Sequence, residues 1–524
     1  MTQTLSMADA IQEVTTNCLV CSSPDGSFQI IRNPSSISPE TGQAFMPAIA
    51  PDRLGDPRFM QRHGLAYPYV AGAMANGISS TALVRTMAEN GMIGFFGAGG
   101  LDLSRIETAI TELKSTLGDN PFGVNLIHSL ADPEHEMATV ELFLKHGIRR
   151  ISAAAFMRMT PALVYYRIKG IHKRVSDNTI VTPNHIIAKV SRIEVARQFF
   201  APPPEKLVAQ LLASGRITSE EAELSRHIPM AWDLTAEADS GGHTDNRPAL
   251  ALLPTMMSLK NQVMEQYGYA QPLCVGLGGG IATPEAAAAA FGMGAAYVLT
   301  GSVNQSCTEA GICEDVRKLL CQAEQADVAM APSADMFEIG ARVQVLKRGT
   351  LFAVRAEKLY TIYKSFAAFE DVDPKTQKEI QDKFLHTDFE TAWAATRQFF
   401  LSRGNPKEVE RADADPRHKM ALVFRSYLGQ SSRWAIQGDR KRKMDYQVWC
   451  GPSMGAFNQW VQNSFLADHD RRQADVVALN LLFGACVATR ASFLRAQGIC
   501  VPPGADAVFP REKQEILSLI QGDC

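Results

Sequence analysis

The sequence predicts an α/β protein built on a closed (β/α)8 TIM barrel, with a helical insertion and a mainly helical C-terminal extension. Short apolar runs alternate with helical patterns from position 68 to position 321, as in parallel α/β proteins. Eight such units fit a closed barrel, which usually takes about 250 residues. The alternative is an open doubly wound sheet. That sheet would need Gly-x-Gly-x-x-Gly after its first strand, where this chain reads AGAMANG.

The eight apolar runs have the length and the flanking residues of buried parallel strands. They cover residues 68–74, 92–100, 122–128, 149–155, 185–191, 228–238, 272–279 and 296–302. Between the first strands, residues 79–91 and 103–117 carry apolar side chains at helical spacing.

The segment 201–227 interrupts this alternation between the fifth and sixth strands. It has three prolines after Ala201 and continues as two short helical patterns. If the segment belongs to a βα loop, it lies at the carboxyl end of the barrel, where active-site loops are found. A lid, a partner-docking element and a loop without a role are then all compatible with the sequence.

We therefore expect three regions along the chain. They are an N-terminal segment (1–67), the barrel with its insertion (68–321) and a C-terminal subdomain (322–524). The last region is predicted to be mainly helical, because 373–401 and 475–498 have helical spacing and strand signals are few.

Composition and charge exclude several classes of protein. A net charge of −3 and a pI near 6.4 lack the basic excess of a dedicated nucleic-acid binder. No uninterrupted apolar stretch reaches the roughly 18 residues that cross a bilayer. The first positive charge is Arg32, so the start lacks the charged region of a signal peptide. We expect a soluble, cytoplasmic protein that binds neither nucleic acid nor membrane.

Ten cysteines are scattered along the chain, as free thiols are in a reducing cytosol. Cys18 and Cys21 form one CxxC, but no second CxxC or histidine pair follows at the spacing of a four-ligand zinc site. We expect no bound metal.

In such a barrel, functional residues collect at the carboxyl ends of the strands. The seventh strand ends in Gly278, Gly279 and Gly280, and the eighth in Thr300, Gly301 and Ser302. Glycines leave backbone amides uncovered, and a helix starting near Pro284 would add the positive end of its dipole. Paired turns after the last two strands commonly bind phosphate in barrels, so we predict a phosphate site there.

The sixth strand is followed by a candidate catalytic histidine. His243 comes directly after Gly241 and Gly242, on a turn predicted to face the barrel mouth. An imidazole there can transfer protons near neutral pH. The acidic residues that flank it, and that could orient the ring, are Glu237, Asp239 and Asp245.

Three other strand ends suit a planar ligand. Asn125 either contacts the edge of a flat heterocycle or ties neighbouring strands. Lys189 can neutralise a reduced flavin or pair with a carboxylate. Gly72, Ala73 and Met74 bring bare backbone and small side chains to the mouth. Together with one phosphate site, these features fit FMN, although spacing alone does not separate FMN from other phosphate-bearing ligands.

Six blocks of the sequence resemble the PfaD family, the stand-alone enoyl reductases of polyunsaturated fatty acid and polyketide synthases. This family is related to the nitronate monooxygenase and FMN-dependent enoyl-reductase barrels. The blocks are AGAMANGISS, GVNLIHS, EADSGGHTDNRP, VGLGGGIATPEAA, YVLTGSVNQ and YQVWCGPSMGAFNQW. The last block, at 446–460, is the most discriminating, and the resemblance extends from about Phe45 to Gly498.

The resemblance implies an FMN-bound barrel that uses NADPH to reduce trans-2-enoyl thioesters on acyl carrier protein, acting in trans. The residues it assigns to FMN binding are Gly72, Ala73, Met74, Asn125, Lys189, Gly279, Gly280, Thr300 and Gly301, with Gly241, Gly242, Gly278 and Ser302 beside them. His243 matches the histidine of the Gly-Gly-His motif, which serves nitronate oxidation in one branch and thioester reduction in the other. Many relatives read EAGGH, whereas this chain has Asp239-Ser240 before the motif.

The resemblance also implies partners, namely acyl carrier protein and other proteins of the synthase. Because carrier proteins are acidic, the basic run 440–443, Lys206 and Arg216 are candidate docking charges. Two other functions stay open: a nitronate monooxygenase-like flavin oxidase, and an assembly component of a synthase with a vestigial barrel. The sequence does not fix the pathway, the substrate chain length, the preference for NADPH over NADH, or whether the protein is a homodimer.

Overall fold

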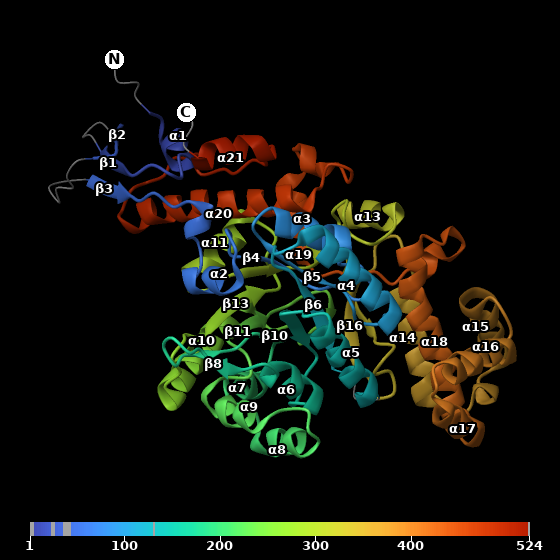
Figure 1. Cartoon of the computed structure of the whole chain (residues 1–524). Coiled ribbons are helices and arrows are strands. Elements are labelled where there is room, and N and C mark those ends of the chain that lie inside the picture. The colour runs from blue at the N-terminus through green and yellow to red at the C-terminus, as the bar shows by residue number, and fades with distance from the viewer. Residues whose placement is uncertain (1–4, 23–26, 35–42, 129–131, 522–524) are drawn as a thin grey trace. The chain divides into compact units, whose positions relative to one another are not determined.

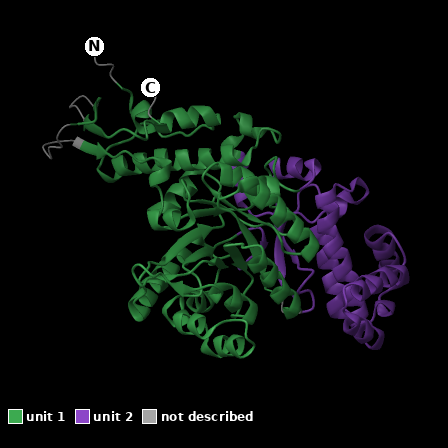
Figure 2. Cartoon of the chain, in the orientation of Figure 1, with its two compact units in different colours: residues 1–239, 246–311, 459–524 green, residues 240–245, 312–458 purple. Residues whose placement is uncertain are grey.

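A computed structural model describes residues 5–22, 27–34, 43–128 and 132–521 (Figure 1). The chain forms two compact units, coloured separately in Figure 2. Unit 1 comprises residues 1–239, 246–311 and 459–524, and unit 2 comprises residues 240–245 and 312–458.

Eight parallel strands of unit 1 close into a barrel in the order β10-β11-β13-β14-β4-β5-β6-β7. They are β4 (Tyr69–Ala71), β5 (Ile93–Phe96), β6 (Gly123–Ile127), β7 (Arg150–Ala154), β10 (His185–Val190), β11 (Asp233–Glu237), β13 (Cys274–Gly278) and β14 (Val298–Thr300). Each strand lies inside one of the eight apolar runs, so the predicted (β/α)8 fold is confirmed.

A helix follows each strand of the barrel. These helices are α3 (Thr81–Glu89), α4 (Leu103–Leu117), α5 (Pro133–Lys145), α6 (Pro161–Ile168), α7 (Ile193–Phe200), α10 (Ala249–Tyr267), α11 (Pro284–Gly292) and the short α12 (Ser302–Gln305). Several begin at a polar side chain that caps the first turn. The hydroxyl of Ser80 accepts from the Leu83 amide before α3, for example.

Apolar side chains fill the interior of the barrel. Val70, Ile187 and Leu299 belong to one buried cluster, together with Tyr297. Phe59 of α2 (Pro57–His63) stacks on the Tyr297 ring, with centroids 4.0 Å apart. Because α2 precedes β4 and its side chains join this cluster, the helix closes the amino-terminal end of the barrel.

A buried polar cluster lies at the closed end. Asp233, the first residue of β11, forms an ion pair with Arg62 and a hydrogen bond with His63, whose Nε2 lies 3.0 Å from Oδ2. The His185 ring lies 5.4 Å from that of His63. The Nδ1 atoms of both histidines are buried without a hydrogen-bond partner among the described residues.

The insertion 201–227 does not belong to a βα loop. The residues after β10 form α7 at once, and the insertion follows as α8 (Glu205–Ala213) and α9 (Ser219–Leu224). It is therefore part of the connection into β11, and such connections lie at the amino-terminal end of a barrel. Of the roles considered for it, a lid at the barrel mouth is therefore excluded. Arg216 is instead paired with Glu141 of α5.

Residues from both ends of the sequence complete unit 1. β1 (Cys18–Ser22), β2 (Phe28–Arg32) and β3 (Gln43–Met46) form an antiparallel sheet beside α1 (Met7–Gln12). From the other end come α20 (Ala474–Ala496), which packs against α11 and β3, and α21 (Lys513–Gln521). Among the described residues, α20 is the one helix long and apolar enough to cross a membrane, and 78% of its most apolar stretch is buried.

Arg490 of α20 fastens the N-terminal segment to unit 1. Its fully buried guanidinium donates to the carbonyl oxygens of Ala10 at 2.8 Å, Thr16 at 2.9 Å and Ile11 at 3.1 Å. One buried cation therefore joins α20 to α1 and to the loop before β1.

The CxxC pair cannot form a disulfide within β1. Residues three apart on a strand point to opposite faces and are about 10 Å apart. That distance exceeds the span of a disulfide. Cys18 is buried and Cys21 is partly exposed, and both thiols are free.

Unit 2 combines a small antiparallel sheet with helices. The strand order is β12 (Gly242–His243), β16 (Arg342–Leu346) and β15 (Val328–Pro332). The helices are α13 (Glu314–Cys321), α14 (Phe352–Ser365), α15 (Pro374–Ile380), α16 (Phe389–Ser402), α17 (Pro406–Ala414) and α18 (Pro416–Gln437), and α19 (Ser453–Val461) returns the chain to unit 1. Their core includes Phe337, Leu359 and Phe424.

The predicted region 322–524 is thus divided in the structure. Residues 459–524 belong to unit 1, because α20 is buried against the helices and strands of that unit. A close approach to α11 makes this possible: a Cβ on Gly484 would lie only 2.6 Å from the Pro284 ring.

Candidate active site

The turn after β4 is held in place by neighbouring backbone. The Gly72 amide donates to the Thr300 carbonyl at 2.9 Å, and Ser79 Oγ donates to the Gly72 carbonyl at the same distance. Ser79 Oγ also accepts from the Met74 amide at 3.0 Å. The predicted segment Gly72-Ala73-Met74 is therefore fixed at the carboxyl end of the barrel by Ser79, a residue that the sequence did not single out.

The turns after β4 and β5 are joined to each other. The Asn76 amide donates to the Gly99 carbonyl at 2.7 Å, and the Gly77 amide donates to the Gly97 carbonyl at 2.8 Å. Asn76 has a φ of 58°, in the left-handed region that asparagine tolerates better than most residues. These bonds make the two turns one rigid element beside the barrel mouth.

Of the two roles considered for Asn125 of β6, the structure shows the tie between neighbouring strands. Its Oδ1 accepts from the Gly99 amide at 3.1 Å, which ties β6 to the turn after β5. The side chain is buried, with 4% exposed. Among the residues that the structure describes, its Nδ2 has no acceptor, so both N–H groups of this amide can donate to a ligand.

Lys189 of β10 and Glu237 of β11 form an ion pair, with Nζ 2.7 Å from Oε1. Their neighbouring strands end at the same rim of the barrel, and both side chains are largely buried. Two roles were considered for Lys189, and the structure shows one of them, the ion pair with a carboxylate. Glu237 therefore neutralises Lys189 and is not the group that orients His243.

The glycine turn after β13 has one crowded and one open position. A Cβ on Gly279 would lie 2.7 Å from the carbonyl carbon of Ala238, and its φ of 88° favours glycine. Gly280, at φ 80°, has no atom within 4 Å of such a Cβ. Gly278 is packed, with a Cβ position 3.0 Å from the Thr235 side chain. Gly280 therefore borders open space.

The turn after β14 is similar. Gly301 also has no atom within 4 Å of a Cβ position, and Ser302 begins α12. The Thr300 side chain points elsewhere: its Oγ1 lies 2.6 Å from the Tyr69 hydroxyl, in a buried contact. Burial raises the pKa of that tyrosine, so the contact is a neutral hydrogen bond. Thr300 thus supports the turn, and Gly301, like Gly280, borders open space.

His243 belongs to unit 2, where it forms part of β12. It pairs with Val343 of β16, and the neighbouring backbone is fixed because Gln344 Nε2 donates to the Ser240 carbonyl at 2.8 Å. A Cβ on Gly241 would lie 2.9 Å from Cys450 backbone, which explains the first glycine of the motif. Gly242 has a φ of 79°, which explains the second.

The group that orients His243 is Asp335. His243 Nε2 lies 3.1 Å from Asp335 Oδ1, which also accepts from the Ser333 hydroxyl. Partial desolvation raises the pKa of Asp335, but the hydrogen bonds and the charge of His243 outweigh this and lower it to about 2. Asp239 of unit 1 accepts instead from Asn246 Nδ2 at 2.7 Å. The expectation that a flanking carboxylate orients the ring is therefore wrong for Glu237 and Asp239.

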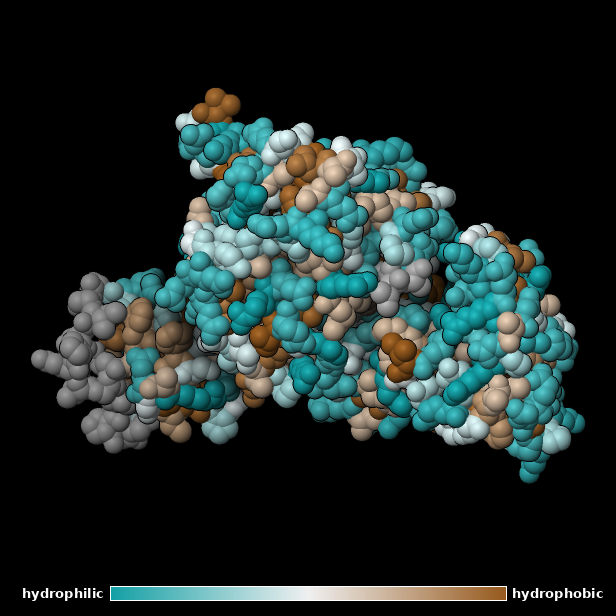
Figure 3. Space-filling view, turned by 90° about the horizontal axis from the view of Figure 1, so that it is seen from below, coloured by the Kyte–Doolittle hydropathy of each residue, from teal (hydrophilic) through white to brown (hydrophobic). Residues whose placement is uncertain are grey.

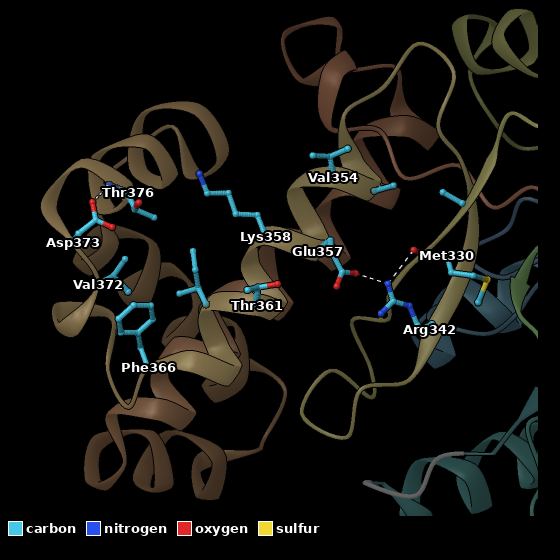
Figure 4. Close-up of a pocket in the computed structure, with 13 residues that line it drawn as sticks. Met330, Arg342, Val354, Glu357, Lys358, Thr361, Phe366, Val372, Asp373 and Thr376 are labelled. Atoms are coloured by element: carbon cyan, nitrogen blue, oxygen red, sulfur yellow. Dashed lines mark hydrogen bonds and ion pairs between the residues drawn. The ribbon is translucent and has the colours of Figure 1, made fainter.

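A separate groove of about 640 Å³ lies within unit 2. Figure 4 shows Met330 and Arg342 from the sheet on one side and Phe366 and Val372 on the other. Its cations are paired within the unit, Arg342 with Glu357 and Lys358 with Glu379. None of the predicted site residues lines this groove.

The surface seen in Figure 3 is mainly hydrophilic, with apolar residues scattered among charged ones. Single exposed apolar side chains are normal on proteins and need no explanation.

The sequence and the fold together define a class of protein. Residues 57–388 match the nitronate monooxygenase family, and the chain belongs to it. The closed barrel and the Gly-Gly-His motif described above are the features that the sequence had indicated for this group. Residues 366–446 also match the inserted helical domain of acyl-carrier-protein S-malonyltransferase.

Particular relatives narrow this assignment. The chain is 44% identical over 84% of its length to a polyunsaturated fatty acid synthase protein from Thraustochytrium, and 42% identical over 83% to polyketide biosynthesis protein PksE from Bacillus subtilis. It covers only 30% and 56% of those proteins. The solved enoyl reductase domain of MlnA, from the macrolactin cluster of Bacillus amyloliquefaciens, matches 85% of the chain and 99% of that domain. Its identity is 37% and the TM-score is 0.80.

Proposed function

We propose that the protein is an FMN-dependent enoyl reductase that uses NADPH and acts on trans-2-enoyl thioesters carried by acyl carrier protein. The observation that carries this proposal is the match to nearly the whole length of a solved enoyl reductase domain. The synthase relatives support a role in polyunsaturated fatty acid or polyketide assembly. The match of 366–446 to a malonyltransferase that acts on acyl carrier protein supports a carrier-bound substrate.

The strand ends of unit 1 suit FMN. Gly280 and Gly301 border open space after the last two strands, where barrels commonly bind one phosphate. The donor Nδ2 of Asn125 and the fixed backbone of Gly72-Ala73-Met74 suit the edge and face of a planar ring. Lys189 would place a positive charge close to that ring, moderated by Glu237.

When bound, FMN would take hydride from NADPH and supply it to an electron-poor carbon. Reduction of the substrate adds that hydride to the β-carbon and one proton to the α-carbon. The carbon–carbon double bond becomes a single bond, and NADPH becomes NADP⁺, so atoms and charge balance.

In this proposal His243 gives the α-carbon its proton and stabilises the enolate oxygen that precedes it. Two observations support the role. The hydrogen bond from the Asp239 amide to the Arg247 carbonyl, at 3.0 Å, pins the base of the loop just beyond β11. Asp335 holds the imidazole by its Nε2, which leaves Nδ1 to face a ligand or a water.

A second candidate function is a flavin oxidase, which membership of the nitronate monooxygenase family favours. Anaerobic mixing of the flavin-loaded protein with NADPH separates the two. Rapid bleaching, followed by reoxidation with an enoyl thioester, is expected for the reductase. An oxidase would resist NADPH and would be bleached by a nitronate.

The FMN site is tested by Gly301→Ala. The new methyl meets no atom within 4 Å and the φ of Gly301 is negative, at −131°, so the FMN-free protein should melt at a nearly unchanged temperature. We expect the Kd for FMN to rise at least tenfold, because the methyl would fill the phosphate space. Gly292→Ala on α11, which also meets no atom, is the matched control. An unchanged FMN affinity in Gly301→Ala would show that the phosphate does not bind at this turn.

A further inference from the structure

An exposed phenylalanine on α16 is flanked by two arginines. Phe399 is 42% exposed. The Arg403 guanidinium carbon lies 5.4 Å from its ring centroid, and the Arg433 guanidinium carbon of α18 lies 5.9 Å from it. We call these three residues the Phe399 patch. The ring also contacts Phe400 edge-on at 5.6 Å, and Phe400 packs on the core of unit 2, so the patch is rigidly based.

Within the part of the chain that the structure describes, no carboxylate pairs with the two arginines of the patch. Among the described residues, neither Arg403 nor Arg433 takes part in an ion pair, whereas Lys419 and Arg425 of the same unit are paired with carboxylates. Between residues 397 and 443 the sequence has twelve Lys and Arg but only five Asp and Glu, in a chain whose net charge is −3. Positive charge is therefore concentrated on this part of unit 2.

Two like charges beside one ring repel each other, and the repulsion is relieved when a carboxylate lies between them. Arginine binds carboxylates through two parallel hydrogen bonds, and an aromatic ring beside it supplies apolar contact area. Arginine and aromatic residues are the side chains that most often dominate protein–protein binding energy. The chemistry of the patch thus fits an acidic protein surface with an apolar residue among its carboxylates.

We propose that the Phe399 patch is the docking site of the acyl carrier domain that delivers the substrate. This inference rests on the proposed function, and it adds the surface that recognises the partner. It replaces the basic run 440–443 as the main docking element. Arg442 of that run is buried against Trp434, and Arg440 and Lys443 face Asp315.

The test is steady-state reduction of two substrates that share one trans-2-butenoyl group. One is carried by a phosphopantetheinylated carrier domain, and the other is a short pantetheine thioester. For the double variant Arg403→Glu and Arg433→Glu, we expect KM to rise at least tenfold with the carrier substrate and to stay within twofold with the short one. Phe399→Ser should raise only the carrier KM, by about fivefold.

The matched control is Arg397→Glu, an exposed cation on α16 that lies about 200° around the helix from Phe399. It should change either KM by less than twofold. Equal effects on both substrates would contradict the docking role of the Phe399 patch. An unchanged KM for the carrier substrate in the double variant would contradict it as well. A double variant that binds RNA or anionic vesicles more weakly than the wild type, but binds the carrier domain equally well, would also contradict the proposal. If the wild-type chain reduces neither substrate, the proposed function fails. Binding of the carrier domain, measured by fluorescence anisotropy for the wild type and the double variant, then still tests whether the Phe399 patch is its docking site.

Discussion

The imidazole of His243 and the carboxylate of Asp335 are in hydrogen-bond contact at 3.1 Å, although 92 positions separate them in the chain. Both residues belong to unit 2, where the segment 240–245 adds a strand to the sheet of residues 328–346. The catalytic candidate is therefore positioned by a unit other than the barrel that would hold the cofactor. Loss of this contact should therefore lower the rate of catalysis and leave the affinity for the cofactor unchanged.

Asp335→Asn should lower kcat for the enoyl thioester about tenfold, because a hydrogen bond to a charged group contributes roughly 1.5–3 kcal/mol and this one is half-exposed. The flavin spectrum and the Kd for FMN should not change. Asp382→Asn, an exposed aspartate of the same unit, is the control. A variant with normal kcat at every pH would show that Asp335 has no part in catalysis.

Acid should destabilise the protein through the polar cluster at the closed end of the barrel. Burial lowers the pKa of His185 and His63, and nearby Arg150 and Arg167 add to the effect on His185. Below about pH 6.5 the unfolded chain therefore binds more protons than the folded one, and stability falls as the pH falls.

The carboxylate of that cluster acts in the same direction. Burial raises the pKa of Asp233, but Arg62 and His63 outweigh this, so its stabilising contribution is lost below about pH 4. Thermal melts from pH 7.5 to 4.5 should show a falling Tm in the wild type and a smaller fall in His185→Phe. His172→Phe, at an exposed histidine, should leave the slope unchanged. An equal slope in His185→Phe would exclude this histidine as the cause.

Arg490→Met should release the N-terminal segment. The substitution leaves several buried carbonyl oxygens without a donor, which we expect to cost about 3 kcal/mol. Hydrogen exchange should become faster in residues 7–22 while the barrel strands keep their protection. Arg495→Met, on the same helix and in an exposed pair with Asp506, should show neither effect. Uniform exchange across unit 1 would mean that Arg490 supports the whole unit.

Arg442→Gln should destabilise unit 2 by about 2 kcal/mol. The guanidinium lies 3.8 Å from the Trp434 ring and pairs with Asp445 at 3.1 Å. The cost is moderate because Arg355 still neutralises that carboxylate. Lys441→Gln, one residue earlier and exposed, should change stability by less than about 0.5 kcal/mol. Urea unfolding followed by tryptophan fluorescence measures both, and equal values would contradict the buried role of Arg442.

The barrel could be predicted because buried parallel strands are continuous apolar runs, such as 274–278, and each is followed by a helix. The position of the insertion could not be predicted without α7. That helix is short, but Val195, Ala196, Phe199 and Phe200 have the spacing of a buried helical face, and this signal was available.

The site was predictable in part. The glycine turns and Asn125 follow strand ends, so their place at the barrel mouth depends on the fold alone. The partners of the charged groups could not be predicted: Lys189 meets Glu237 through strand pairing, and His243 meets Asp335 through a sheet formed by distant segments. Whether those predicted residues bind FMN stays a prediction.

The division of unit 1 also has a consequence for synthesis on the ribosome. Unit 2 is almost continuous in sequence, so it can fold as soon as residue 458 has left the exit tunnel. The barrel has all eight strands by then but still lacks α20, whose apolar surface covers α11. Nascent chains halted before residue 474 should therefore expose the apolar surface of α11 and recruit chaperones.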